Sequence, residues 1–183
     1  MVTSFNSLDA SVDQSKKILS LIIIKEVANN SPTHFYHHIE TFKSKFIHML
    51  RDKQMMVREV TADALSSCLM LLQNRENIKK NDYYYAFISI VEELAKDKRN
   101  EYIHGYLLGI HSFLTSTHDY CSSHIGKFYE QVQVYFNTKD FYIKTTIIRM
   151  QITVLFLLDR FDSHYGQIHD CACQFLLHTE HKE

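Results

Sequence analysis

Glycine and proline are scarce in this sequence, and tryptophan is absent. The 183 residues include four Gly, one Pro and no Trp. Sandwiches, barrels and doubly wound sheets need many turns, and turns are built largely from Gly and Pro, so this scarcity argues against a sheet protein. No stretch alternates with a period of two for long enough to predict a strand. An all-helical chain is the simplest explanation.

Neither sign of charge predominates in the sequence. Twenty Lys and Arg residues stand against 21 Asp and Glu residues, which gives a formal net charge of -1 at pH 7. Such a chain lacks the strong positive field that attracts nucleic acids or anionic membrane surfaces. Its basic clusters are diluted by acids and are not interleaved with aromatic residues, so we expect no nucleic-acid partner. The hydrophobic fraction of 45% is ample for a core.

Targeting and membrane-spanning signals are not found either. The first 15 residues are polar, and the apolar run Ile18–Ile24 is short, broken by Ser20 and followed directly by Lys25. This pattern fits neither a signal peptide nor a membrane span. Four cysteines are spread without a regular disulfide framework: Cys68, Cys121, Cys171 and Cys173. We therefore expect a reduced, soluble, intracellular protein.

Helical periodicity accounts for most of the chain. Eight amphipathic segments are predicted, at roughly residues 11–28, 32–49, 57–72, 82–94, 103–114, 120–136, 141–161 and 165–178. In the second segment the apolar residues recur every three or four positions: Phe35, Ile39, Phe42, Phe46 and Met49. The third segment has an apolar face so wide that it predicts burial on two sides. Short helices joined by short polar turns pack antiparallel to their neighbours.

One pattern recurs where a helix ends and the next begins. An acidic residue lies in the turn, and an aliphatic residue followed by a base or His opens the new helix. The residues in this pattern are Asp52, Val57 and Arg58, then Asp97, Ile103 and His104, then Asp140, Ile143 and Lys144. The aliphatic positions lie 46 and 40 residues apart, and two-helix HEAT-type repeats are about 40–47 residues long.

The prediction is therefore an all-α, HEAT-type α-solenoid of about eight antiparallel helices in four pairs. We expect one array over residues 1–183, with repeats at about 11–50, 54–97, 99–137 and 139–180. The repeat-signature residues are expected to be structural. His104 should reach the acidic turn of a neighbouring repeat, and Arg58 with Asp52 should link repeats in the same way.

Candidate functional residues are few. Tyr85 falls on the polar side of its helix and is a candidate protein-contact residue, although single exposed aromatics are also common. Cys68 lies in an apolar stripe, which favours a small core residue over a nucleophile. We expect no catalytic residue.

Twelve histidines raise the question of a metal site. A C-terminal set offers six donors: His164, His169, Cys171, Cys173, His178 and His181. Its spacing is poor, because on a helix Cys171 and Cys173 would point about 200° apart. His34 and His38 lie four residues apart, but no nearby carboxylate completes a catalytic set. We therefore expect no metal and no cofactor.

Several stretches, in one order, resemble the N-terminal HEAT region of target-of-rapamycin (TOR) kinases. In the first, a helix ending at Ala28 is followed by a Pro-Thr-x-Phe start at Pro32. The others are Val57-Arg58-Glu59 through Arg75-Glu76, Asp97 through Arg99 with Ile103-His104-Gly105, Lys127-Phe128 with Gln131-Val132, and Ile143-Lys144 with Thr146-Ile147. The resemblance covers about Leu21 to Phe161. Family members often carry a long insertion after the Ile-His-Gly helix, where this chain has only Thr115 to His118.

The resemblance implies a scaffold segment of a serine/threonine protein kinase. Its implied partners are a Raptor-type subunit and other TOR-complex components, in the cytoplasm or peripheral to endomembranes through the parent complex. The chain lacks a Gly-rich phosphate loop, a catalytic-loop Asp/Asn arrangement and an Asp-Phe-Gly motif, so it is not expected to be an enzyme itself. We expect a fragment of a longer solenoid or, alternatively, a free-standing HEAT-repeat adaptor.

Overall fold

The computed structural model describes residues 1–9, 11–75, 79–157, 165–166, 169–170 and 173. Over these residues the chain forms ten helices and no strand. The all-α prediction is therefore confirmed, and the antiparallel packing is consistent with a helical repeat. The chain divides into two compact units, Met1–Thr117 and His118–Glu183. The described helices of the second unit are α8 (His118–Ser122), α9 (Ile125–Gln133) and α10 (Phe141–Leu157).

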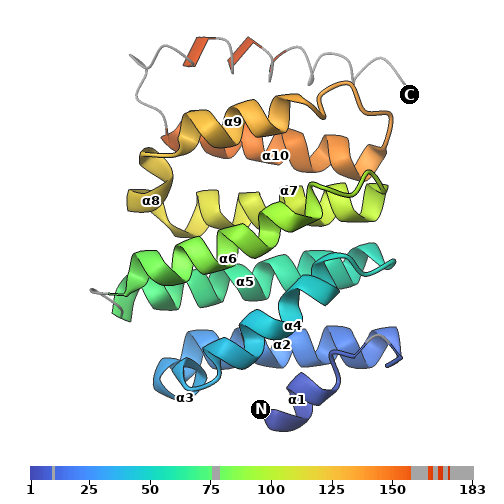
Figure 1. Ribbon diagram of the computed structural model, residues 1–183, viewed down its shortest axis with the longest axis vertical. Coiled ribbons are helices and arrows are strands. Elements are labelled where there is room, and N and C mark those ends of the chain that lie inside the picture. The colour runs from blue at the N-terminus through green and yellow to red at the C-terminus, as the bar shows by residue number, and fades with distance from the viewer. Residues whose placement is uncertain (10, 76–78, 158–164, 167–168, 171–172, 174–183) are drawn as a thin grey trace. The chain divides into compact units, whose positions relative to one another are not determined.

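The first unit is built around a row of three long helices. Its elements are α1 (Val2–Asn6), α2 (Gln14–Asn30), α3 (Pro32–Tyr36), α4 (Ile39–Leu50), α5 (Met55–Arg75), α6 (Lys80–Leu94) and α7 (Asn100–Ser116). In the row, α5 lies between α2 and α7 and packs against both (Figure 1). Helix α4 packs on α5 and α7, and α6 packs on α7, so these two helices form a second layer.

The apolar stripe predicted for residues 32–49 lies in the core of this unit. Its five members are at most 1% exposed: Phe35, Ile39, Phe42, Phe46 and Met49. The ring centroids of Phe46 and Phe87 are 5.3 Å apart, which joins α4 to α6. Between its two neighbours, α5 is buried on two sides as predicted, with Ala64, Leu65 and Cys68 fully inaccessible.

An aspartate lies shortly before each of the four longest helices, which are α2, α5, α7 and α10. In each case the carboxylate accepts a backbone N–H from the residue two positions later and shapes the turn that leads into the helix. The pairs are Asp13 with Ser15 (3.0 Å), Asp52 with Gln54 (2.9 Å), Asp97 with Arg99 (3.0 Å) and Asp140 with Tyr142 (3.0 Å). The acidic turn read from the sequence therefore has a local structural cause.

Two predicted helices are each broken into two. The segment 32–49 divides into α3 and α4 because His38 donates its N–H to the carbonyl of Phe35 (2.7 Å), which tightens the backbone into a 3₁₀-type turn. The segment 120–136 divides into α8 and α9. There the hydroxyl of Ser123 donates to the carbonyl of Tyr120 (3.0 Å) and competes with the helical pairing.

Other boundaries also differ from those predicted. The short helix α1 was missed, although Phe5 within it is 2% exposed. The linker between the third and fourth segments is shorter than expected, because α5 continues to Arg75 and α6 begins at Lys80. The guanidinium of Arg75 lies 4.8 Å from the ring centroid of Tyr36 and holds the last turn of α5 in place. Most of the eighth predicted segment, 165–178, lies outside the described residues.

Candidate interaction cleft

Arg58 is the centre of a buried polar network where the first turn of α5 meets the first turn of α7. Only 5% of this residue is exposed. Its Nε–H donates to Nδ1 of His104 (2.9 Å), and its Nη1–H groups donate to the carbonyls of Asp52 (2.7 Å) and Lys53 (3.1 Å). A guanidinium can only donate, so Nδ1 of His104 accepts and the ring proton lies on Nε2. The network joins two helix starts 46 positions apart.

The carboxylate of Asp52 extends this network to α2. Lys17, which is 6% exposed, donates from Nζ to Oδ2 of Asp52 at 2.8 Å. The other oxygen of Asp52 accepts the N–H of Gln54, the residue directly before α5. Because a buried ammonium is costly without a partner, Lys17 and Asp52 depend on each other. One aspartate therefore connects the starts of α2 and α5.

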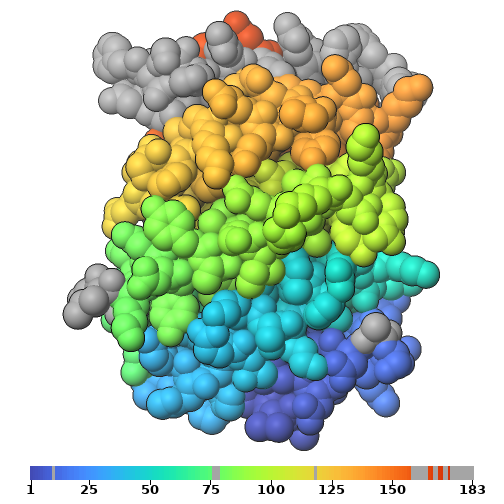
Figure 2. Space-filling view, in the orientation of Figure 1, coloured from blue at the N-terminus to red at the C-terminus, as the bar shows by residue number. Residues whose placement is uncertain are grey.

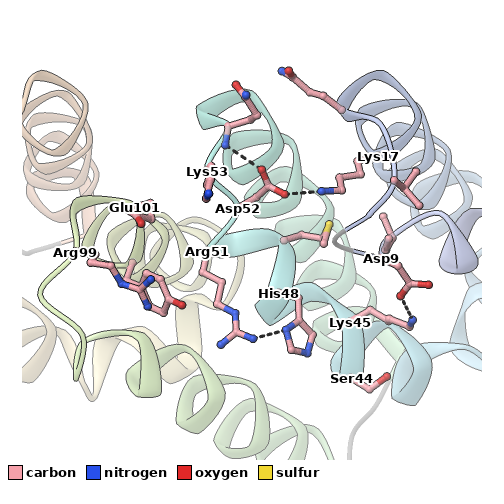
Figure 3. A pocket seen from close by; sticks show the side chains of 16 residues that line it. Asp9, Lys17, Ser44, Lys45, His48, Arg51, Asp52, Lys53, Arg99 and Glu101 are labelled. Carbon is pink, nitrogen blue, oxygen red and sulfur yellow. Dashed lines mark hydrogen bonds and ion pairs between the residues drawn. The ribbon is translucent and has the colours of Figure 1, made fainter.

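A cleft of about 980 Å³ opens beside this network (Figure 3). Its lining comes from three stretches, within residues 8–17, 44–54 and 99–102. Five lining residues are basic and three are acidic: Lys17, Lys45, Arg51, Lys53 and Arg99, with Asp9, Asp52 and Glu101. Two of the acids are paired within the lining, Asp52 as above and Asp9 with Lys45 (2.7 Å). The cleft therefore presents an excess of positive charge.

Two arginines of the cleft lie over one aromatic ring. The guanidinium carbons of Arg99 and Arg51 are 3.9 Å and 5.9 Å from the ring centroid of Tyr102, within the range of cation–π attraction. Arg99 also donates from Nη2 to Oδ2 of Asp97 (2.7 Å). Hydrogen bonds from Arg99 lower the pKa of Asp97. The same side-chain pair raises the pKa of Arg99.

His48 lies in a partly desolvated, positively charged part of the cleft, and both features lower its pKa. Its Nδ1 lies 2.5 Å from Nη2 of Arg51, which is the donor. Desolvation lowers the pKa of His48 most, the charges of Arg51 and Lys45 lower it further, and Asp9 opposes them. The imidazole is therefore neutral near pH 7 and serves Arg51 as an acceptor.

The remaining residues predicted from the sequence lie in varied surroundings. Val57 and Ile143 are buried, whereas Ile103 and Lys144 are half-buried. Tyr85 on α6 is 55% exposed and does not line the cleft. The structure brings Asp52, Arg58 and His104 together. Asp97 instead pairs locally with Arg99. Ile143 and Lys144 belong to the second unit.

Lys17 and Tyr102 were missed by sequence reasoning. The signal for Lys17 was present, because it is a lone base on the otherwise small and apolar buried face of α2, with Ser20, Leu21, Ile24 and Ala28. Tyr102 gave no such signal: its role depends on two arginines that lie 51 residues and three residues before it in the chain. Such a long-range juxtaposition has no local sequence pattern.

Cys68, His34 and His38 do not line the cleft. Cys68 is fully buried, and desolvation raises its pKa, so this side chain is a core thiol as expected. Among the described residues, no group of three or more His, Cys, Asp or Glu is placed to hold a metal. The rings of His34 and His38 meet edge to face at 5.2 Å. Four of the six C-terminal donors (His164, Cys171, His178 and His181) lie outside the described residues.

No helix in the described part of the chain is long and apolar enough to cross a membrane. The cleft is an open surface whose lining combines Arg, Lys and Tyr side chains with apolar ones. Arg and Tyr are the residue types that dominate binding energy at protein interfaces. The excess of positive charge in its lining suits a negatively charged ligand.

Comparison with known proteins shows similarity to a group of large kinases. The chain is 30% identical over 172 residues to serine/threonine-protein kinase TOR of Arabidopsis thaliana, which covers 90% of this chain and 7% of that kinase. It is 29% identical over 166 residues to the TOR kinase of Oryza sativa subsp. japonica, again covering 90% of the chain and 7% of the relative. Serine/threonine-protein kinase tor1 of Schizosaccharomyces pombe is 27% identical over 125 residues, 68% of this chain and 5% of that kinase.

The chain is therefore distantly homologous to a short segment of TOR serine/threonine kinases. It spans about 7% of the length of the plant relatives that it matches. No protein-family model matches the chain, and no solved structure matches it.

Proposed function

We propose that this chain is a non-catalytic scaffold segment equivalent to part of the N-terminal HEAT arm of a TOR serine/threonine kinase. In this proposal the chain is a HEAT-type solenoid with repeats at about 11–50, 54–97, 99–137 and 139–180. It docks regulatory or substrate-presenting subunits in nutrient and growth signalling. Its work is positional, since it brings a partner to an active site elsewhere in the parent complex.

The observation that supports this proposal most is the link between Arg58 and His104. The two residues occupy equivalent places in consecutive predicted repeats, directly after Val57 and Ile103, and they contact each other through a buried hydrogen bond. Such a contact stiffens the connection between neighbouring helix pairs. A stiff array can hold a docked subunit at a fixed place, which a scaffold requires.

The cleft is the proposed docking surface. Arg51, Lys53 and Tyr102 offer two cations and an aromatic ring on one open surface. A partner segment rich in Asp and Glu would complement the excess positive charge. By resemblance the partner is a Raptor-type subunit or another TOR-complex component, and the location is cytoplasmic or peripheral to endomembranes. Tyr85 stays a candidate for a second contact outside the cleft.

The size of the native product tests whether the chain is one arm of a kinase. Antibodies raised against two peptides of this chain should detect, in cell extract, a band far larger than 21.6 kDa that co-purifies with protein kinase activity. A stable product of about 21.6 kDa without associated kinase activity would contradict this. It would favour the alternative function, a free-standing HEAT-repeat adaptor.

A further inference from the structure

Ser31 is the one residue between α2 and α3, and it is exposed. Proline lacks an N–H and disfavours a helical backbone in the residue before it, so Pro32 separates the two helices. Ser31 accordingly has a φ of -137° and a ψ of 59°, outside the helical region. Its N–H donates to the carbonyl of Val27 (2.9 Å), and its carbonyl accepts the N–H of Phe35 (3.0 Å). The backbone of Ser31 is therefore held on both sides.

The hydroxyl of Ser31 is free, although the residue stands at the N-cap position of α3. It makes no capping hydrogen bond, and no other partner for it is found in the described part of the chain. Two other exposed hydroxyls are occupied. Oγ of Ser44 donates to the carbonyl of Thr41 (2.9 Å), and Oγ1 of Thr33 accepts from Nη1 of Arg75 (3.0 Å). A free hydroxyl at an exposed connection between helices is accessible to a modifying enzyme.

The residue that follows makes Ser31 unique in the sequence. Pro32 is the single proline among 183 residues, so no other Ser or Thr precedes a proline. Proline-directed serine/threonine kinases require a proline directly after the residue that they phosphorylate. Because proline has no N–H, it can enter a pocket that would leave the N–H of any other residue unpaired. Such a kinase can therefore act on this chain only at Ser31.

The surface beside Ser31 is hollowed over about 560 Å³. The region of α3 lies at the surface, at the lower left of the space-filling view (Figure 2). None of the side chains that line the hollow is acidic: Asn30, Ser31, Pro32, Thr33, His34 and His37. Both histidines are exposed, and Arg75 adds a positive charge through its hydrogen bond to Thr33. Imidazole and guanidinium N–H groups are good donors to a phosphate.

We propose that Ser31 is a phosphorylation site for a proline-directed serine/threonine kinase, and that its phosphate contacts His34 and His37. In the transfer, Oγ of Ser31 bonds to the γ-phosphorus of ATP, and the bond from that phosphorus to the β-phosphate oxygen breaks. The hydroxyl proton passes to the base of the kinase, and ADP leaves. At pH 7 the new group carries a charge of about −1.5 to −2, which the donors of the hollow can pair. The proposal is independent of the scaffold function and of the cleft.

Phosphorylation of the folded 183-residue chain with Mg²⁺ and ATP tests the site. The enzymes are a purified cyclin-dependent kinase and a purified mitogen-activated protein kinase, each shown in parallel to phosphorylate a Ser-Pro peptide. Mass spectrometry should find one phosphoryl group per chain, at Ser31. Ser31→Ala should remove it, and Pro32→Ala should slow the transfer about tenfold or more, although the hydroxyl remains.

Ser44→Ala is the matched control, because it also removes an exposed serine hydroxyl but one that no proline follows. It should be phosphorylated as the wild type is. Circular dichroism should show the same helix content in the wild type, Ser31→Ala and Ser44→Ala. A folded wild type that neither kinase modifies would overturn the proposal. Modification that persists in Ser31→Ala, or that is as fast in Pro32→Ala as in the wild type, would overturn it too.

Phosphorus NMR of the phosphorylated chain tests the contact with the histidines. A phosphoserine loses its second proton at about pH 6, and positive groups beside it favour the dianion. The wild type should therefore lose this proton at a lower pH than the phosphorylated double variant His34→Asn with His37→Asn. Both imidazoles are exposed, so the double variant should keep its helix content. Equal titration of the two proteins would contradict the placement of the phosphate in the hollow.

Discussion

Arg58 and His104 are 46 positions apart in the sequence, yet the Nε–H of Arg58 donates to Nδ1 of His104 at 2.9 Å. The two residues are 5% and 2% exposed. Because Arg58 also donates to the carbonyls of Asp52 and Lys53, one guanidinium holds the turn before α5 against the first turn of α7. Asp52 and Lys53 also line the cleft, so this contact holds part of its wall.

Breaking this network should destabilise the first unit. Arg58→Leu leaves Nδ1 of His104 and two carbonyls without their donor, at a cost of about 2–4 kcal/mol in free energy of unfolding. His104→Leu removes the acceptor that the buried Nε–H of Arg58 uses and costs about 1–3 kcal/mol. Urea unfolding followed by circular dichroism measures both, since the chain has no Trp. The double variant should lose less than the sum of the two; strict additivity would mean that the residues are not coupled.

Two lysine–aspartate pairs allow a matched comparison of burial. The side chains of Lys17 and Asp52 are 8% and 12% exposed, whereas those of Lys25 and Asp63 are 34% and 60% exposed. Lys17→Met leaves a poorly solvated carboxylate and should cost about 1–3 kcal/mol in free energy of unfolding. Lys25→Met breaks a pair that is open to water and should cost less than about 1 kcal/mol. Equal effects in urea unfolding would contradict the importance assigned to Lys17.

The titration of His48 should report the charge of the cleft. Its pKa lies below the ordinary value of 6.5, through desolvation first and Arg51 next. A lowered pKa in the folded chain stabilises the neutral form, so this contribution is present above pH 6.5 and is lost as the pH falls through the folded pKa. Histidine NMR should find the lowered pKa, and Arg51→Ala should raise it. Lys139→Ala is the control and should not move it; equal titration curves in both variants would rule out Arg51 as a cause.

At Gly105 the backbone of α7 lies close to the last residue of α4, Leu50. A Cβ at this position would lie 1.9 Å from the carbonyl oxygen of Leu50, a backbone atom that cannot rotate away. Gly105→Ala should therefore cost about 3 kcal/mol or more in free energy of unfolding. At Gly109 the Cβ would lie 2.6 Å from a side-chain carbon of Val91. Gly109→Ala should therefore lower the free energy of unfolding less than Gly105→Ala does.

Gly126 provides the control for this comparison. A Cβ there meets nothing within 4 Å, and alanine is the better helix former by up to about 1 kcal/mol. Gly126→Ala should therefore be neutral or stabilising. A Gly105→Ala variant as stable as Gly126→Ala would contradict the packing of α7 on α4.

The helical class and much of the core could be predicted from local pattern alone. Spacings of three and four residues placed Phe42 and Phe46 correctly in the core, and the paucity of Gly and Pro excluded a sheet. The breaks at His38 and Ser123 could not be predicted, because each depends on one hydrogen bond that competes with an otherwise regular helix. Helix α1 is too short for periodicity to detect.

The candidate site was only partly predictable. Asp52, Arg58 and His104 stood out because they recur at equivalent places in the repeat pattern. Their contacts still differ from a simple acid–base pair: Arg58 reaches the carbonyl of Asp52, and the carboxylate of Asp52 binds Lys17 instead. The cleft itself combines three stretches distant in sequence, so only the folded chain brings Tyr102 close to Arg51.

Binding of the purified chain to a purified Raptor-type subunit tests the scaffold proposal most directly. Isothermal titration calorimetry should show saturable binding by the wild type. The double variant Arg51→Glu with Lys53→Glu reverses two charges of the cleft and should weaken binding about tenfold or more. Lys139→Glu should bind as the wild type does. No binding by the wild type would contradict the scaffold proposal, and equal binding by all three proteins would contradict the cleft as the docking surface.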